Sequence, residues 1–342
     1  MEKRNEAERK DEKWVHDASV DYKGRVPLRA STGVWKASLF VLTIEFSERV
    51  TFFGLATNLI SYLTQVIHQD LKTAVKNVNY WTGTTTIMPL IGGFLADAYT
   101  GRFLMVLLSS LVYLAGLSLL TMSEFIPSLK PCKIKLCPRP RKIHEVVFFL
   151  ALYCISFGTG GYKPCLESFG ADQFDDDHPQ ERKKKASFFN WWNFAMCLAL
   201  LLGVTVVVYV QDNVSWGVAS LLLTILMAIT IIAFYLGKSF YRYRSPGGNP
   251  FTPILQVVIA AIRKRKLAFH SNSDLLYEIP KSEDSKGRLL THTSRLRFLD
   301  KAAMIEEKYV GQRDHNPWRL ATVTKTTKRR VMEDDDGVEI IA

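Results

Sequence analysis

Residues 213–237 read NVSWGVASLLLTILMAITIIAFYLG, 25 residues without one charged side chain. Two further stretches share this character, the 24 residues from Phe188 to Gln211 and the 21 residues from Phe103 to Ser123. A helix rises about 1.5 Å per residue, so about 20 apolar residues cross the roughly 30 Å of a bilayer's hydrocarbon core. The sequence therefore predicts an all-α membrane protein.

The composition as a whole hides this pattern. The chain has 342 residues, 48% of them hydrophobic, and a mean hydropathy of only +0.03, values that would also describe a soluble protein of two domains. The apolar residues are gathered in blocks, however, and the charged residues lie between the blocks. This arrangement disfavours a soluble enzyme, a collagen-like chain, a disulfide scaffold and a disordered chain. We expect the protein not to be an enzyme.

Six membrane-spanning helices are predicted, and they divide the chain into four parts. The part before the helices, residues 1–33, is expected to be a cytoplasmic tail, solvated as far as Ala30. The six-helix bundle covers residues 34–237, and the central cytoplasmic loop covers residues 238–324. A charged tail, residues 325–342, ends the chain. The expected helices are 34–63, 79–99, 103–125, 145–169, 187–210 and 215–237.

The net charge of +11 is distributed in a way that indicates membrane topology. Residues 1–30 hold 8 Lys and Arg, and residues 238–342 hold 20. Basic flanks face the cytoplasm and anionic lipids, so both termini are predicted to be cytoplasmic. The loop after the third helix, with six basic residues between Lys130 and Lys142, is an exception to this rule. A basic amphipathic helix at residues 251–266 favours the membrane surface or the cytoplasmic helix ends over a nucleic-acid patch.

The five cysteines form no CxxC pair and no His/Cys cluster, so we expect no metal site and no cofactor. Cys132 and Cys137 lie close together in the polar third loop. With the N-terminus in the cytoplasm, this loop faces an oxidising compartment where a disulfide can form. The sequence is compatible with either a disulfide or two free thiols at these positions.

The first predicted helix carries the sequence EFSER at residues 45–49, inside an otherwise apolar span. Spacings of three and four residues place Glu45, Glu48 and Arg49 on one face of a helix. Charges at membrane depth are costly unless they face a protein interior or water, so these should face a polar cavity. Two carboxylates beside one arginine form a coupled group that can bind a proton. The alternative is a structural ion-pair cluster that does not titrate.

A further cation, Lys163, lies in the fourth predicted helix within the sequence GGYKP at residues 160–164. Glycine and proline weaken the helix locally and allow neighbouring backbones to approach. Lys163 is expected to pair with Glu45 or Glu48 at membrane depth. A lysine that extends to the nearby aqueous interface is the alternative.

The turn between the second and third predicted helices reads GGFLADAYTGR, residues 92–102. Its glycines allow a tight turn on the cytoplasmic side. Asp97 and Arg102 can bridge neighbouring helix ends, and this contact can break when a domain moves. The alternative is an ordinary polar turn.

These motifs together resemble the plant nitrate/peptide transporter family, a branch of the proton-dependent oligopeptide transporters in the major facilitator superfamily. The resemblance rests on EFSER at 45–49, residues 93–102, GGYKP at 160–164, and FGADQF at 169–174. It extends through FLDKAA at 298–303 and NPWRL at 316–320, which are similar to the family's central loop.

The resemblance implies roles for particular residues. Glu45, Glu48, Arg49 and Lys163 would form the proton-coupling group, with the proton as coupling ion. Asp97 and Arg102 would form the cytoplasmic gate. The segment FFNWWN, residues 188–193, is similar to the family's fifth-helix signature, which lines the substrate cavity. The implied cavity residues are Phe52, Phe53, Trp191, Asn193 and Cys197.

Two departures from the family pattern bear on the substrate. Peptide carriers of the family commonly have tyrosines where this chain has Phe52 and Phe53, and an asparagine where it has Cys197. Both changes remove hydrogen-bonding groups. Nitrate or another small organic anion or metabolite therefore becomes as good a candidate as a peptide.

The resemblance also implies a second bundle of six helices after residue 324. Residues 325–342, KTTKRRVMEDDDGVEIIA, contain no span. We expect a truncated form of a proton-coupled symporter in the plasma membrane or the vacuolar membrane. Its partners would be lipid, protons, a small solute and a complementary C-terminal half or an oligomer, and no nucleic acid. The alternative is a membrane-embedded fragment that does not transport and acts as an interaction or regulatory subunit.

Overall fold

The computed structural model describes residues 13–15, 17–126, 142–246, 248 and 251–264. They belong to two compact units, residues 1–246 and residues 247–342. Cys132 and Cys137 lie outside the described residues, as do the central loop beyond residue 264 and the tail at 325–342.

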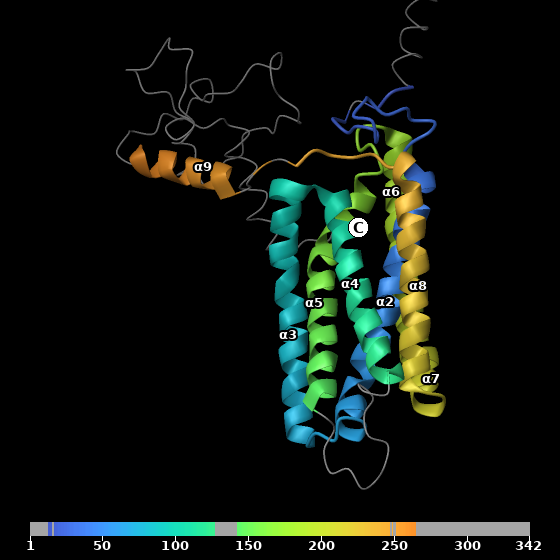
Figure 1. The fold of residues 1–342 in the computed structure, drawn as a ribbon. Helices are drawn as coiled ribbons and strands as arrows, with labels where there is room; N and C mark the ends of the chain where they lie inside the picture. Colours follow the sequence, from blue (N-terminus) through green and yellow to red (C-terminus); the bar gives the residue numbers. More distant parts are fainter. Residues whose placement is uncertain (1–12, 16, 127–141, 247, 249–250, 265–342) are drawn as a thin grey trace, which may run out of the picture. The chain divides into compact units, whose positions relative to one another are not determined.

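Within the described part of the first unit, six long helices run antiparallel, each back along the one before (Figure 1). The ends near residues 34, 102, 171 and 237 gather at one end of the bundle, which we call the proximal end. The helices are α2 (Val34–Gln65), α3 (Leu71–Leu95), α4 (Arg102–Phe125), α5 (Lys142–Ala171), α6 (Pro179–Leu202) and α8 (Trp216–Leu236). Short turns extend three of them: a π-helical turn Ala96–Thr100 after α3, a π-helical turn Gly203–Val207 and α7 (Val208–Asn213) after α6, and a 3-10 turn Gly237–Ser239 after α8.

The all-α fold and the predicted helix order are confirmed, but two helices begin earlier than expected. α3 begins at Leu71 instead of residue 79, and α6 begins at Pro179 instead of residue 187. The Asp70 side chain caps α3 by accepting a hydrogen bond from the Thr73 backbone N–H at 3.0 Å. A proline at the first helical position suits α6 because its fixed φ is already helical. Hydropathy detects only the apolar part of each helix, so these polar first turns were missed.

Four described helical stretches are long and apolar enough to cross a membrane: Arg102–Phe125, Lys142–Ala171, Pro179–Asn213 and Trp216–Ser239. α2 and α3 are long enough but more polar. α2 carries Glu45, Glu48 and Arg49, and these three side chains are buried inside the bundle. The polarity of α2 is therefore directed towards protein and not towards lipid.

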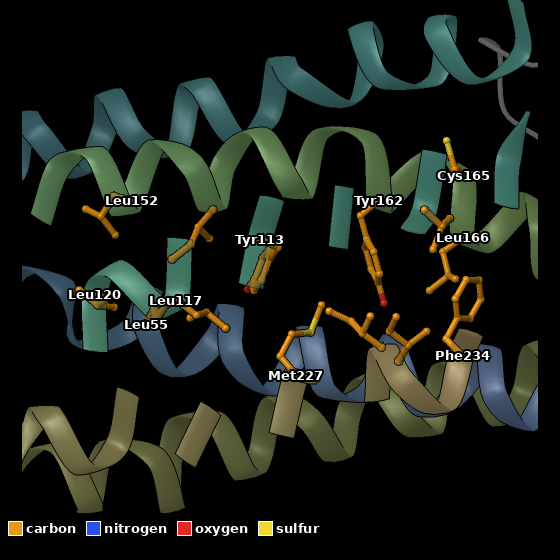
Figure 2. Packing of buried hydrophobic residues seen from close by; sticks show 14 of the residues in the cluster. Leu55, Tyr113, Leu117, Leu120, Leu152, Tyr162, Cys165, Leu166, Met227 and Phe234 are labelled. Carbon is orange, nitrogen blue, oxygen red and sulfur yellow. The ribbon is translucent and has the colours of Figure 1, made fainter. Parts of the chain in front are cut away.

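The core of the bundle is built from apolar side chains of α2, α4, α5 and α8. Figure 2 shows the packing of ten of them, which are Leu55, Tyr113, Leu117, Leu120, Leu152, Tyr162, Cys165, Leu166, Met227 and Phe234. Each is at most 5% exposed. Two of these buried residues, Tyr113 and Tyr162, carry a polar hydroxyl group, and this bears on the site described below.

Glycine allows α3 and α5 to approach closely. A Cβ atom placed on Gly92 would lie 2.3 Å from the Gly160 carbonyl oxygen, which is a backbone atom and cannot rotate away. Gly83, on the same helix α3, has no such neighbour within 4 Å. The two glycines therefore form a matched pair of positions, one crowded and one open.

Gly92→Ala is expected to destabilise the bundle by about 1 to 3 kcal/mol, because α3 and α5 must separate to admit the methyl group. Gly83→Ala adds the same methyl group to the same helix in open space, and its stability should stay the same or rise slightly. Thermal unfolding of the detergent-solubilised variants, followed by tryptophan fluorescence, measures both. Equal melting temperatures for the two variants would contradict the close packing of α3 on α5.

The N-terminal segment differs from the solvated tail that the sequence predicted. Residues 13–15 and 17–33 fold over the proximal end of the bundle, where Val15 is 1% exposed. Isolated β-bridges join Trp14 to Leu28 and Val20 to Tyr243. The mixed charge of this segment suggested solvent exposure, but several of its charges pair with residues far away in the sequence.

In the second unit, the described residues form α9 (Phe251–Arg263). The sequence predicted an amphipathic helix over 251–266. The helix begins where expected, and Arg263 is the basic residue of its last turn. Leu255 and Ile262 are exposed, while Val257, Ala260 and Ala261 are buried.

Candidate functional site

The charged face of α2 lies inside the bundle. Glu45 and Arg49 are 4% exposed and Glu48 is fully buried, as the spacing of the three residues predicted. Arg49 forms an ion pair and a hydrogen bond with Glu48, and its Nε atom lies 3.5 Å from the Glu45 Oε1 atom. The guanidinium also lies 5.2 Å from the ring centroid of Phe52. One cation thus contacts two buried carboxylates and an aromatic ring.

Two buried tyrosines border this cluster. Tyr113 on α4 and Tyr162 on α5 are both fully buried, and both interact electrostatically with Glu48 and Arg49. The Tyr113 and Tyr162 hydroxyl groups have no hydrogen-bond partner within the described residues. Buried polar atoms are nearly always paired, so two unpaired hydroxyl groups beside the ion-paired cluster mark a site where hydrogen bonds can be exchanged.

Neither tyrosine was predicted to be a site residue. Tyr113 stands in the charge-free stretch that begins at Phe103, where a tyrosine is expected to be an ordinary core residue. Tyr162 directly precedes Lys163, and the charged lysine was predicted to be the site residue of this motif. The available signal was a tyrosine hydroxyl at membrane depth, which needs a polar partner.

Lys163 is exposed on the surface of the bundle. It interacts electrostatically with Glu45 and Glu48, but neither carboxylate lies within ion-pair distance of its ammonium group in the described part of the chain. The predicted direct pairing is therefore absent from this conformation. Arg49, on the same helix as both carboxylates, occupies the position that Lys163 was expected to take.

The expected cavity residues fall into two groups. Phe52 and Phe53 on α2 are half-buried; Phe52 stacks on Trp81 of α3 with centroids 5.8 Å apart and contacts Phe53 edge-on at 5.7 Å. The second group, Trp191, Asn193 and Cys197, is exposed on α6. Among the described residues, no ring contact or hydrogen bond joins the α6 group to the two phenylalanines.

The expected gate residues are in contact at the proximal end. The Arg102 Nε atom lies 3.3 Å from the Asp97 Oδ1 atom, and the Arg102 Nη1 atom lies 2.5 Å from the Asp172 Oδ2 atom. Arg244 approaches the other Asp172 oxygen, with its Nε atom at 3.2 Å. Burial raises the pKa of the Asp172 carboxyl, although Arg102 and Arg244 act in the opposite direction.

A second ionic network at the proximal end was not foreseen. Arg242 is fully buried; its Nη1 atom lies 2.7 Å from the Glu181 Oε2 atom, and its Nη2 atom donates to the Thr32 carbonyl oxygen at 3.0 Å. Arg29 binds the other Glu181 oxygen at 2.6 Å and Asp175 at 2.9 Å. We call these residues the proximal clasp: Arg29, Thr32, Asp175, Glu181 and Arg242. The clasp joins the N-terminal segment, the start of α6 and the chain that follows α8.

A glycine shapes the clasp. Gly33 has φ of +71°, a left-handed conformation that favours glycine. A Cβ atom on Gly33 would lie 2.4 Å from the Arg242 Nε atom. The turn into α2 therefore leaves the space that the Arg242 side chain occupies. No group of three His, Cys, Asp or Glu side chains that could hold a metal ion is found among the described residues.

Comparison with known proteins relates this chain to one family. The family model PTR2, described as the POT family, matches residues 103–333. The Arabidopsis thaliana protein NRT1/PTR FAMILY 5.6 is 59% identical over 322 residues, which are 94% of this chain and 56% of that protein. NRT1/PTR FAMILY 5.7 of the same plant is 57% identical and covers 94% of this chain and 54% of its own length. The chain spans about half the length of the curated relatives it matches.

Solved structures of transporters share the fold. The crystal structure of the POT family transporter PepTSo covers 69% of this chain and 43% of its own, with a TM-score of 0.55 and 21% identity. An auto-inhibited POT family peptide transporter has a TM-score of 0.55 and 22% identity, with the same coverage. At this identity the likeness concerns the fold alone.

Proposed function

The chain belongs to the POT family, and from this premise we propose that it forms the proton-coupling half of a proton-coupled symporter for small solutes. Nitrate, peptides and other small organic anions or metabolites are the candidate substrates. The observation that carries the proposal is the burial of Glu45, Glu48 and Arg49 together inside the bundle. Ionisable groups at membrane depth are costly and mark proton or ion pathways.

The charge balance of the cluster explains how it would bind a proton. Arg49 contacts both Glu45 and Glu48, so one positive charge faces two carboxylates. An uncompensated negative charge in a buried site is costly, and a proton on one carboxyl removes it. Protonation of Glu48 weakens its pairing with Arg49 and frees the guanidinium to turn towards Glu45 or the unpaired tyrosine hydroxyls.

Lys163 and the aromatic residues connect this step to the solute. The ammonium group of Lys163 is exposed and lies within the electrostatic field of both carboxylates. The ammonium group attracts an anionic group of the solute. Protonation of Glu45 or Glu48 removes a negative charge that would otherwise compete with the solute for this ammonium group. Phe52 and Phe53 lie beside Arg49, and with Trp191, Asn193 and Cys197 they would line the path. Phenylalanines and a cysteine offer little hydrogen bonding, which disfavours peptides.

The Asp97–Arg102 contact would serve as the gate on the cytoplasmic side. It is exposed enough to break and reform, since the Asp97 side chain is 55% exposed. Alternating access in this fold involves movement of one bundle against a second. We therefore propose that a complementary second bundle acts with this one, in the plasma membrane or the vacuolar membrane, with both termini in the cytoplasm.

An uptake experiment tests the function. A chimera of residues 1–324 followed by the remaining half of NRT1/PTR FAMILY 5.6 is reconstituted in liposomes and assayed with labelled solutes under an inward proton gradient. Saturable uptake should be several-fold higher with the proton gradient than without it. A protonophore, which collapses the gradient, should lower uptake to the level measured without a gradient. The 342-residue chain alone is the control and should not accumulate solute. Uptake by the chimera that ignores the protonophore would contradict proton coupling.

A further inference from the structure

An exposed acidic residue accompanies Lys163 on α5. Glu167 lies one helical turn after Lys163, and both side chains are exposed. Among the described residues, neither forms a hydrogen bond or an ion pair within 4 Å. The head groups of both residues are therefore available to a ligand.

The two charges lie away from the apolar surface of α5. The most exposed apolar side chains of this helix are Ile143, Val146, Leu150 and Phe157, each more than half exposed. At about 100° per residue, Lys163 and Glu167 point about 90° to 130° away from the centre of this apolar stripe. α5 therefore presents one exposed surface suited to lipid and another that carries charge.

The charged pair lies within electrostatic reach of the buried cluster. Both Lys163 and Glu167 interact electrostatically with Glu45 of α2, and Lys163 also interacts with Glu48. The charged groups linked to the pair are thus the two carboxylates of α2, which Arg49 in turn contacts. Glu167 extends the proposed proton-coupling group towards the proximal end of the bundle, beyond the residues that the sequence analysis assigned to it.

Helix stability offers no reason for Glu167. It stands four residues before α5 ends at Ala171, and a negative charge close to a helix C-terminus is unfavourable to the helix dipole. Lys163 and Glu167 form no ion pair within 4 Å, so their interaction contributes little to the stability of the helix. An exposed carboxylate with an electrostatic cost and no partner is better explained by a ligand.

We propose that Glu167 is a specificity-determining residue, and that with Lys163 it selects small solutes that carry a cationic group, zwitterions included, over simple anions. The inference rests on the proposed transport function and narrows its substrate class. Side chains one helical turn apart have Cβ atoms about 5 to 6 Å from each other, so one small solute can contact both charged head groups. A simple anion meets attraction from Lys163 and repulsion from Glu167.

The test compares ligand pairs that differ in one cationic group: alanine with lactate, and phenylalanine with phenyllactate. Binding is measured as thermal stabilisation of the purified 342-residue chain, and uptake is measured with the chimera. The unmodified protein should prefer the amine-bearing member of each pair. Glu167→Gln should lower this preference about fivefold, as expected for the loss of one partly solvated charge contact. Glu167→Asp keeps the charge and should retain most of the preference.

Asp177→Asn is the matched control. Asp177 is an exposed carboxylate ten residues further on, and among the described residues its side chain has no partner. This variant should keep the preference of the unmodified protein. Proton-driven uptake with an unchanged preference in Glu167→Gln would overturn the inference and leave the symport intact. A Glu167-dependent binding preference without proton-driven uptake would uphold the inference and overturn the symport. The absence of binding and uptake for all four probes would overturn the inference, while the symport would be overturned only if nitrate and peptides also show no proton-driven uptake.

Discussion

Glu48→Gln is expected to abolish proton-driven uptake by the chimera, while exchange of solute across the membrane continues. The amide keeps the size and shape of the side chain but cannot take up a proton. Glu48 is the carboxylate that Arg49 binds directly, so its neutralisation leaves the guanidinium permanently released towards Glu45. Exchange of labelled for unlabelled solute requires no net proton movement, and it should therefore survive.

The measurement pairs uptake under a proton gradient with counterflow at equal pH on both sides. Glu145→Gln is the control within the same bundle. Glu145 is a carboxylate on α5 that accepts a hydrogen bond from Gln69 at 2.7 Å, outside the buried cluster. It should retain both activities. Full proton-driven uptake by Glu48→Gln would rule out Glu48 as a coupling residue.

Tyr113→Phe and Tyr162→Phe give an independent view of the same cluster. Each removes a buried hydroxyl that has no partner among the described residues. Loss of an unpaired buried polar group should leave stability unchanged or raise it by up to about 1 kcal/mol. If the hydroxyls receive Arg49 or Glu48 after protonation, both variants should also shift the pH at which uptake is half-maximal. A lower melting temperature in either variant would show that its hydroxyl is paired.

Local pattern predicted much of this bundle because the relevant physics is local. The charge-free stretches are long enough to cross a bilayer, and they became helices α4, α6 and α8. Spacing along one helix fixes which side chains share a face, and the cost of charges in lipid predicted that the face of Glu45, Glu48 and Arg49 is turned away from lipid. The polar turns that begin α3 and α6 escaped hydropathy, since they are helical without being apolar.

Contacts between distant segments could not be predicted in this way. Lys163 was assigned to a carboxylate of α2, but Arg49 lies one turn or less from both carboxylates and pairs with them instead. Arg242 and Glu181 are 61 residues apart in sequence. Each looks like an ordinary polar residue next to a span, and only the folded chain brings them together with Thr32.

Arg242 is expected to stabilise the bundle through its buried contacts. Its guanidinium is fully buried and binds Glu181 and the Thr32 carbonyl oxygen. The Gln173 side chain also accepts from the Arg242 backbone N–H at 2.8 Å and donates to its carbonyl oxygen at 3.1 Å. Arg242→Met removes the charge but keeps a long side chain, so the loss measured is mainly the ionic contact.

We expect Arg242→Met to lower the free energy of unfolding by about 3 kcal/mol or more, because removing one partner leaves a buried charge on Glu181. Arg29 still binds that carboxylate, so the loss should fall towards the lower end of the range for broken buried pairs. Thermal unfolding of the detergent-solubilised chain measures the effect. Adding Glu181→Gln to Arg242→Met should recover part of the loss, since the uncompensated charge is then gone.

Arg25→Ala provides the comparison that separates burial from charge. Arg25 also pairs with an aspartate, Asp21, at 2.9 Å, but its side chain is 67% exposed. Exposed ion pairs contribute little because water solvates both partners, so this variant should unfold at the temperature of the unmodified chain. If Arg25→Ala and Arg242→Met unfold at the same temperature, the clasp does not hold residues 13–33 onto the bundle. If only Arg242→Met unfolds early, the segment predicted to be a solvated tail contributes to the stability of the bundle.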